Sequence, residues 1–219
     1  MNLGIYGASG FGKEIYDIAL RVNDKSKLWD NIFFIDDGIE NNVNIYLSKS
    51  YKLELLEEYY NKAEVEIIIA IGEPVIRKKL FEKIALNGYR MTNLIDPTAL
   101  VSPTAKLGIG VILTSFCSVA SNAIIGNNVA VNVKSIIGHD IVIGENTVIS
   151  SMVNVGGACI VGSGSYLGMA CQIKEGKTIG YDSIIGMGSV VHNDIPDEMI
   201  ALGNPARPMR KNIEKKVFK

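Results

Sequence analysis

VILTSFCSVASNAIIGNNVAV (residues 111–131) carries an aliphatic side chain at every sixth position, at Leu113, Val119, Ile125 and Val131. The same step continues without a break from Val101 to Val191, through sixteen aliphatic positions. Glycine follows the aliphatic residue in nine of the sixteen hexads, and a small or β-branched residue stands four positions after it in most of them. A repeat of this length decides how the rest of the chain is interpreted.

The repeat predicts a parallel β-helix, in which each hexad forms a short strand and a turn and three hexads close one triangular coil. The aliphatic side chain points inward and stacks on its equivalents in neighbouring coils, and the small side chain also faces inward near a corner. We expect the recurrent glycine to relieve the turn, where a positive φ is often needed. One hexad, IKEGKT (173–178), has Lys177 at the small position, so its coil is expected to be distorted or open toward a ligand.

Residues 1–96 follow a different pattern, in which strand and helix periods alternate. Alternating β and α elements predict right-handed crossovers and a parallel sheet, so this part is a small Rossmann-like α/β domain. The expected strands are 2–7, 31–37, 65–72 and 91–96, and the expected helices are 11–22, 51–61 and 74–88. The predicted β-helix domain covers 97–195. Residues 196–219 form a C-terminal tail or cap with an extended segment and a short basic helix.

The composition indicates a soluble globular protein, because 47% of the residues are hydrophobic and 21% are charged. With 22 Lys and Arg against 23 Asp and Glu, the chain has no electrostatic footprint for nucleic acid or an anionic membrane. No apolar run is long enough to span a bilayer, and the N-terminus lacks a signal-peptide pattern, so we expect a cytoplasmic protein.

The cysteines and histidines argue against disulfides and metal. Cys117, Cys159 and Cys171 show neither CxxC nor paired spacing, and all three fall at the inward small position, where a thiol behaves as a compact hydrophobe. The chain has only 2 histidines, too few for a zinc site built from three of them. We therefore expect no metal.

The stretch GIYGASGFGKE (4–14) closes the first strand and opens the first helix. Its glycines let backbone N–H groups approach an anion at a helix N-terminus. The spacing is G-x-x-G-x-G, not the dinucleotide pattern G-x-G-x-x-G, and a tight structural turn explains it equally well. Asp36 and Asp37, which end the second strand, can accept hydrogen bonds from a ribose or a base. Because ligands bind beyond the carboxyl ends of parallel strands, these groups and residues 70–73 predict a site for a nucleotide-bearing small molecule.

SIIGHDIVIG (135–144) holds a histidine followed directly by an acid. His139 stands two positions after the inward aliphatic residue, so its side chain is expected to point outward, and an ordinary surface histidine is the alternative. In a cleft between subunits, an imidazole with an unperturbed pKa of about 6.5 suits a general base. Asp140 could orient the ring, although neighbours in sequence meet only at a turn or across an interface. His192 is expected to be structural.

ALGNPARPMRK (201–211) follows the last coil. One interpretation is a turn and a cap for the exposed end of the β-helix, which any solenoid requires. The other is a wall that carries Arg207, Arg210 and Lys211 toward a phosphorylated cofactor. The two interpretations are compatible.

Three motifs in this order resemble a known family: GASGFGKEI in an N-terminal α/β domain, hexads containing GHDIVIG, and a final GNPAR. They look like the left-handed β-helix acyltransferases of the sialic-acid O-acetyltransferase type. The arrangement is most similar to the nucleotide-amino-sugar N-acetyltransferases that make bacillosamine and perosamine precursors. The resemblance covers essentially the whole chain. It implies a left-handed β-helix, acetyl-CoA as donor, a homotrimer with active sites between neighbouring β-helices, and an acceptor nucleotide held by the N-terminal domain.

The resemblance also implies roles for individual residues. His139 is the general base and Asp140 its partner. The acceptor site comprises Gly7, Ser9, Gly10, Asp36, Asp37, Gly72, Glu73 and Asn132. The cofactor groove comprises Gly157, Met169 and Met187, with Arg207 added from the tail. Val148 and Phe11 stand where relatives often have histidine, so we expect a backbone N–H to help hold the thioester oxygen, and the acceptor stays open.

These features predict an acetyl-CoA-dependent N-acetyltransferase acting on the 4-amino group of a nucleotide-linked amino-deoxysugar, in surface polysaccharide or glycan biosynthesis. The amine attacks the thioester directly while His139 removes its proton. A direct transfer fits cysteines that face inward. The alternatives are O-acetylation of sialic acid or another sugar hydroxyl, and a non-catalytic trimeric scaffold that binds nucleotide sugars. A nicotinamide-dependent enzyme is disfavoured by the glycine spacing.

Overall fold

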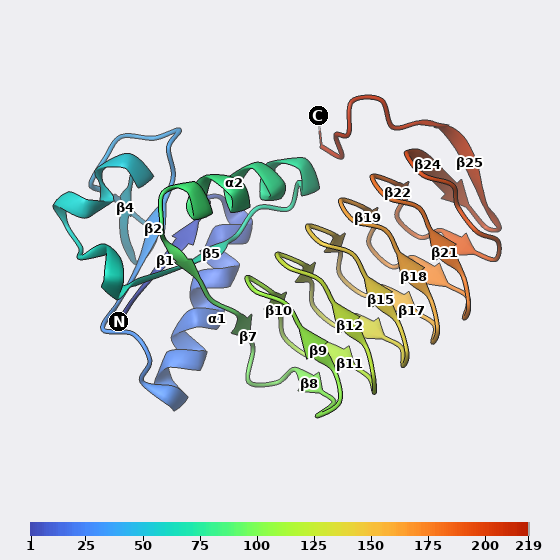
Figure 1. The fold of residues 1–219 in the computed structure, drawn as a ribbon, viewed down its shortest axis with the longest axis horizontal. Coiled ribbons are helices and arrows are strands. Elements are labelled where there is room, and N and C mark those ends of the chain that lie inside the picture. Colours follow the sequence, from blue (N-terminus) through green and yellow to red (C-terminus); the bar gives the residue numbers. More distant parts are fainter. Residues whose placement is uncertain (219) are drawn as a thin grey trace.

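The computed structural model describes residues 1–218, in which an α/β domain lies against the side of a stack of coils (Figure 1). The α/β domain contains β1 (Asn2–Tyr6), α1 (Gly10–Ser26), β2 (Asn31–Ile35), β3 (Val43–Ile45), β4 (Ser48–Tyr51), two 3₁₀ helices (Leu53–Glu58 and Lys62–Glu64), β5 (Val65–Ile69), α2 (Pro74–Leu86) and β6 (Arg90–Met91). A hairpin of β24 (Met199–Gly203) and β25 (Ala206–Lys211) follows the coils and precedes the C-terminal tail.

The coils are built from strands of two residues each, which form three faces. The first face contains β7 (Leu94–Ile95), β10 (Ile112–Leu113), β13 (Ala130–Val131), β16 (Val148–Ile149), β19 (Tyr166–Leu167) and β22 (Ile184–Ile185), and the closing hairpin adds to it. The second face contains β8 (Leu100–Val101), β11 (Ser118–Val119), β14 (Ile136–Ile137), β17 (Asn154–Val155), β20 (Gln172–Ile173) and β23 (Val190–Val191). The third face contains β9 (Lys106–Leu107), β12 (Ile124–Ile125), β15 (Val142–Ile143), β18 (Ile160–Val161) and β21 (Thr178–Ile179).

The register confirms the left-handed parallel β-helix. Ile112 on β10 lies opposite Ala130 on β13, so each coil takes three hexads, and the same offset repeats on all three faces. All sixteen aliphatic positions belong to one apolar core or pack against it. The small inward positions are buried as well, and the hydroxyls among them bond to the next coil, as Ser135 Oγ does to the carbonyl of Ser150 at 2.8 Å.

The expected role of the recurrent glycine is wrong. None of the nine glycines has a positive φ. Most of them are needed because a side chain would strike the backbone one coil away; a Cβ on Gly144 would lie 2.4 Å from the amide nitrogen of Ser163. The left-handed residues form a separate column three positions after the aliphatic residues from Leu107 to Ile185. They are Gly110, Phe116, Asn122, Asn128, Lys134, Asp140, Asn146, Met152, Ala158, Gly164, Ala170, Gly176, Asp182 and Gly188.

Four other expectations also need correction. The coil with Lys177 is not distorted in its backbone, because β21 pairs with β18 in the common register. The predicted helix 51–61 is the end of β4 followed by a 3₁₀ helix. The segment 91–96 is split between β6, in the α/β sheet, and β7, which already pairs with β10 of the β-helix. Among the described residues, the tail after β25 contains no helix.

The α/β sheet has the strand order β3-β4-β2-β1-β5-β6. It is parallel apart from β3, which forms an antiparallel hairpin with β4, so the expectation of a purely parallel sheet is corrected at this edge. Helix α1 packs on one face of the sheet and α2 on the other, each against its own apolar cluster. Strand β1 is central because the chain forms β2 on one side of it and later forms β5 on the other.

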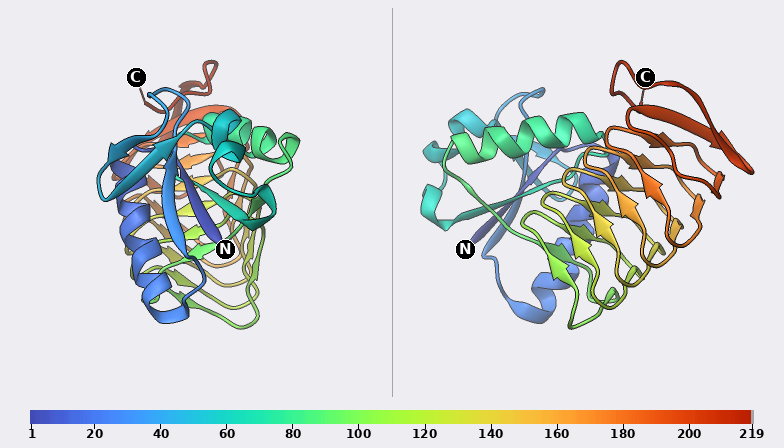
Figure 2. Two further views of the ribbon diagram at one scale, coloured as in Figure 1. Left: turned by 90° about the vertical axis from the view of Figure 1, so that its left-hand side faces the viewer. Right: turned by 45° about the vertical axis from the view of Figure 1, so that its right-hand side comes forward.

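The α/β domain covers the first face of the β-helix, as the two views in Figure 2 show. The outward side chains Leu94, Ile112, Ala130 and Val148 of that face belong to the same buried cluster as α1. Arg77 on α2 is fully buried and donates hydrogen bonds to the carbonyl and side-chain oxygens of Asn128 at 2.7–2.9 Å. The domain boundary between residues 96 and 97 stays a prediction. Strand β7, which precedes this boundary, already pairs with β10 of the coils.

Candidate active site

His139 and Asp140 lie in the turn between β14 and β15, at the corner where the second face meets the third. We call this the His corner; it comprises the turns 120–123, 138–141, 156–159 and 174–177. His139 Nδ1 is 2.7 Å from Asp140 Oδ2. Two neighbours in sequence can meet because Asp140 has φ 55°, a left-handed conformation that turns its side chain back toward the ring.

A second contact fixes the carboxylate from the coil below. Asn122 Nδ2 donates to Asp140 Oδ1 at 3.0 Å, and Asn122 is the residue eighteen positions before Asp140. This hydrogen bond, followed by the one from His139, lowers the pKa of Asp140 below its usual value. Asp140 therefore stays ionised under neutral conditions, and a carboxylate is the form that can hold an imidazole by its Nδ1–H.

The next coil leaves room for the imidazole through Gly157. A Cβ at this position would lie 2.6 Å from His139 Nε2 and 2.7 Å from Cε1, so any side chain here would collide with the ring. Gly157 and His139 thus belong to one site. The His139 side chain is 66% exposed in this single chain, so the ring stays accessible.

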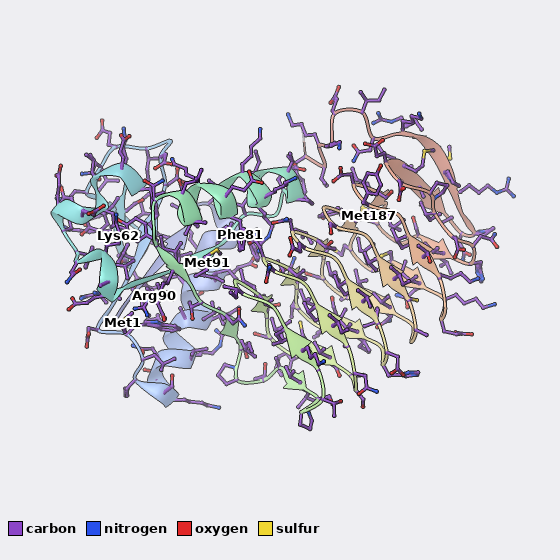
Figure 3. The ribbon with its side chains drawn as sticks, viewed as in Figure 1. Met1, Lys62, Phe81, Arg90, Met91 and Met187 are labelled. Carbon is purple, nitrogen blue, oxygen red and sulfur yellow. The ribbon has the colours of Figure 1, made fainter. Side chains whose placement is uncertain are left out.

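The other expected cofactor residues lie at a different corner. Met169 and Met187 follow β19 and β22, where the first face meets the second, and Asn132 follows β13 at the same corner. We call this the Met corner; it comprises the turns 132–135, 150–153, 168–171 and 186–189. Met187, labelled in Figure 3, is 75% exposed and Met169 is 46% exposed. Asn132 lines a cavity of about 300 Å³ between this corner and α1.

The glycine-rich turn lies between β1 and α1, at the carboxyl edge of the sheet. Gly7 has φ 113° and a Cβ there would lie 2.8 Å from the carbonyl oxygen of Ala70, so only glycine fits. Gly10 faces open space, with no atom within 4 Å of a Cβ. Ser9 is the N-cap of α1, yet its side chain makes no capping bond. This turn therefore leaves donors available to a ligand at the start of α1.

The two acids after β2 point to different places. Asp36 Oδ2 accepts from the amide of Ala8 at 3.2 Å, so it borders the glycine-rich turn. Asp37 accepts from Tyr6, from Lys83 Nζ at 2.5 Å and from the amide of Leu53 at 3.0 Å. Burial alone would raise the pKa of Asp37, but these donors, Lys83 first, lower it. The Asp37 carboxylate is therefore bonded within the α/β domain, whereas Asp36 borders the glycine-rich turn.

Gly72 and Glu73 follow β5, the strand next to β1. Glu73 accepts hydrogen bonds from the amides of Val217 at 2.8 Å and Phe218 at 3.0 Å, in the C-terminal tail. Gly72 lies against the Phe218 ring, with a Cβ position 3.6 Å from Cε2. Arg207 lies on β25, exposed, beyond the last coil. The expected acceptor and cofactor residues are thus distributed over the sheet edge, two corners and the closing hairpin.

Sequence reasoning missed several contacts of the site. Asn122 could have been found by stepping back one coil from Asp140, since the coil length follows from the repeat. The tail residues at Glu73 carry no such signal. Val148 and Phe11 take apolar roles: Val148 is buried under the α/β domain, and Phe11 packs against the same cluster. Burial raises the pKa of Cys171 to about 12 and also raises that of Cys117, which fits thiols without a nucleophilic role.

Residues 1–218 contain no group of three or more His, Cys, Asp or Glu side chains placed to hold a metal ion. In the same part of the chain, no helix combines the length and the apolar character that crossing a membrane requires.

Comparison with known proteins supports the resemblance seen in the sequence. Residues 2–84 match the family profile described as the PglD N-terminal domain. A GDP-perosamine N-acetyltransferase from Escherichia coli O157:H7 is 29% identical over 145 residues, which cover 61% of this chain and 60% of that protein. The matched part is therefore less than two thirds of that relative's length.

Two solved structures match almost the whole chain. The acetyltransferase domain of PglB from Neisseria gonorrhoeae FA1090 has a TM-score of 0.87 and 29% identity, covering 95% of this chain and 99% of that domain. That domain has also been solved in complex with acetyl coenzyme A. A perosamine N-acetyltransferase variant from Caulobacter crescentus, in complex with CoA and GDP-perosamine, has a TM-score of 0.85 and 26% identity, covering 96% and 98%.

Proposed function

We propose that this chain, which is similar in sequence and fold to sugar acetyltransferases with a left-handed β-helix, transfers an acetyl group from acetyl-CoA to the 4-amino group of a nucleotide-linked amino-deoxysugar. The two solved structures described above, which match over both domains, are an acetyltransferase domain and a perosamine N-acetyltransferase, solved with acetyl coenzyme A and with CoA and GDP-perosamine respectively. The observation that carries the proposal for this chain is the His139–Asp140 pair, exposed on a rigid corner.

The pair supports general-base catalysis. When Nδ1–H of the neutral imidazole donates to Asp140, Nε2 carries no proton and can act as a base. The sugar amine attacks the thioester carbonyl carbon and Nε2 takes the amine proton. The C–S bond then breaks to give the amide and the CoA thiolate, which takes the proton from the imidazolium and so restores the neutral base. Asp140 stabilises the imidazolium formed on the way, and Asn122 holds Asp140 in place. Such a base contributes about 10²–10⁴-fold to the rate.

The N-terminal domain is proposed to hold the nucleotide of the acceptor. The groups that support this are Gly7, Ser9 and Gly10 at the start of α1, with Asp36 and Gly72 beside them. The resemblance implies the same site for Asp37 and Glu73, whose carboxylates accept hydrogen bonds from Lys83 and from the backbone of Val217 in the free chain. Gly157, Met169, Met187 and Arg207 are proposed to line the path of the CoA moiety, with Asn132 near the acceptor.

One chain alone does not complete this site, which supports a homotrimer. The α/β domain covers the first face of the β-helix, whereas the His corner joins the other two faces. Both of those faces present exposed aliphatic side chains that flank His139. They are Leu100 and Ile136 on the second face, and Ile124, Val142 and Ile160 on the third. A second copy would cover this apolar surface and bring its own Met corner and nucleotide site to His139.

The test is release of CoA from acetyl-CoA with a panel of UDP-, dTDP- and GDP-4-amino-4,6-dideoxysugars, with free sialic acid included. We expect turnover on one amino sugar and a loss of about 10²–10⁴-fold in kcat/KM for His139→Ala. His192→Ala is the matched control and should keep its activity. Turnover on sialic acid alone would instead establish O-acetylation. Acetyl-CoA binding without turnover on any acceptor would favour the scaffold.

A further inference from the structure

The crevice beyond β1 and β5 is the natural position for a ligand in the α/β domain. The strand order reverses there, because α1 leads from β1 to one side and the chain later returns to form β5 on the other. In open α/β sheets, ligands bind outside the carboxyl ends of the strands at this switch point. Its two sides are the glycine-rich turn after β1 and Gly72–Glu73 after β5. We call this space the acceptor crevice.

The C-terminal segment, residues 213–218, reaches one side of this crevice with Val217 and Phe218. Figure 1 shows the tail leaving the closing hairpin at the far end of the coils and returning toward one end of α2. The Glu73 carboxylate accepts hydrogen bonds from the backbone amides of Val217 and Phe218, at 2.8 and 3.0 Å. The Phe218 ring meets Tyr166 edge to face, with centroids 5.6 Å apart, and also lies against Gly72.

The contacts of Val217 and Phe218 with Glu73 and Gly72 are of the same kind as those that a bound nucleotide would make there. A carboxylate that accepts two adjacent N–H groups can equally accept the two hydroxyls of a ribose or two donors on the edge of a base. A planar ring placed against a glycine backbone and a tyrosine occupies the kind of surface on which a base stacks. Glu73 is the N-cap residue of α2, yet its carboxylate makes no capping bond and is given entirely to the tail.

We propose that the C-terminal segment is a strap that occupies the β5 side of the acceptor crevice in the free chain and is displaced when the nucleotide binds. This inference rests on the proposed nucleotide site. In the free chain, Glu73 holds the strap, and in the complex Glu73 is released to the ligand. The strap thus sets the apparent affinity for the acceptor and leaves the chemistry at His139 unchanged.

The strap is held weakly, as such a switch requires. Phe218 is 51% exposed and Ile213 is 84% exposed, so little apolar surface is buried along it. Its base is fixed by Lys215, whose Nζ lies 2.6 Å from Asp182 and 3.2 Å from Glu198. Segments with few buried contacts open at the low end of the stability range. If the strap is closed about 90% of the time, it weakens nucleotide binding about tenfold, because only the open fraction can bind.

The first experiment compares the full chain with a truncation that ends at Lys216, which keeps Glu73 and Lys215. Binding of UDP, dTDP and GDP is measured by calorimetry, and acetyl-CoA binding is measured beside it. We expect the truncation to bind the preferred nucleotide about tenfold more tightly and to bind acetyl-CoA unchanged. Phe218→Ala, which keeps the two amides, should show a smaller gain. Lys216→Ala, an exposed position of the same segment, is the matched control and should bind like the full chain.

A second measurement follows the strap directly in the full chain. We expect added nucleotide to increase hydrogen exchange at the Val217 and Phe218 amides, as their bonds to Glu73 open. Weaker or unchanged nucleotide binding by the truncation would overturn the proposal, as would slower exchange, which would make the tail a fixed wall. Absence of binding for all three nucleotides in both chains would overturn it too. Acetyl transfer that depends on His139 tests the proposed function independently of these results.

Discussion

At His139, a backbone conformation and a missing side chain together position the imidazole. The left-handed turn at Asp140 allows two neighbours in sequence to share a hydrogen bond, and Gly157 one coil above leaves space for the ring. Asp140 and Gly157 are both needed to place the ring of His139. The histidine depends on three turns of one corner, at Asn122, Asp140 and Gly157.

Gly157→Ala is expected to separate ring position from folding. Gly157 has no left-handed φ, so alanine is tolerated by its backbone, but the new methyl group must displace the imidazole. We expect kcat/KM to fall about 10²-fold, because a misplacement of about 1 Å has this cost, while the free energy of unfolding changes by less than about 1 kcal/mol. In NMR spectra, the His139 ring signals should shift and those of His192 should stay. Full activity would show that the ring geometry does not matter.

Asp96 is a second residue whose environment is specific. It follows β7, and its buried carboxylate accepts hydrogen bonds from Thr98, from Arg21 at 2.6 Å and from Ser115 at 3.0 Å. Because Arg21 lies on α1, these bonds join α1 to the first coils. Burial alone would raise the pKa of Asp96, but these hydrogen bonds outweigh it and lower the pKa to about 2.

Because the folded pKa of Asp96 lies below the unfolded value of about 4, this carboxylate stabilises the fold above pH 4 and stops doing so as the pH falls toward 2. Asp96→Asn should therefore lower the free energy of unfolding by about 2 kcal/mol at neutral pH. The difference from the wild type should shrink between about pH 4 and pH 2, as followed by urea denaturation. If the difference in the free energy of unfolding persisted at pH 2, its cause would be the packing of the side chain and not the charge of Asp96.

Among the elements, the turns differ in how well their residues suit them. Glycine, asparagine and aspartate fill most of the left-handed column, but Lys134 has φ 59° and is exposed. Lys134→Gly should raise the free energy of unfolding by about 1 kcal/mol, the cost of a left-handed non-glycine residue. Lys106→Gly, on strand β9 and also exposed, should lower it by about 0.5–1 kcal/mol. Equal effects at both positions in chemical denaturation would contradict this account of the turns.

Helix α2 is attached to the coils by Arg77. The guanidinium is fully buried, and its recorded partners are oxygens of Asn128, Ile69 and Ile71; no carboxylate is among them. Burial lowers its pKa to about 9, so it stays charged at neutral pH.

Arg77→Met keeps most of the volume but leaves these oxygens without donors, so we expect a loss of about 3 kcal/mol in the free energy of unfolding. Lys79→Ala, on the exposed side of α2, should change it by less than about 0.5 kcal/mol. Protease sites in α2 should become accessible in the Arg77 variant first. Unchanged denaturation curves would show that the apolar contacts alone orient the domain.

For the whole molecule, the arrangement of faces separates the groups that the reaction needs. The sheet edge proposed to bind the nucleotide belongs to the domain that packs on the first face, whereas His139 lies at the corner between the other two faces. In a trimer each active site then takes its base from one copy and its nucleotide site from another.

This predicts complementation between two inactive chains. Co-expression of His139→Ala with Asp36→Ala should restore about a quarter of the wild-type activity if the copies mix at random, because one site in four then has both residues intact. Two His139→Ala chains together should stay inactive. Ile160→Glu, on the apolar third face, should give monomers in light scattering and abolish turnover. No recovery on co-expression would place the whole site within one copy.

The sequence by itself determined the coils, because the six-residue period is a local property: each aliphatic residue faces inward wherever the step continues, and an acid or asparagine at the left-handed position follows from its own turn. It also placed His139 outward. Only the tertiary structure decided which turns meet, since contacts one coil apart, such as Asn122 with Asp140, depend on stacking. The tail on Glu73 and the covered first face depend on packing between segments far apart in the chain, for which no local pattern exists.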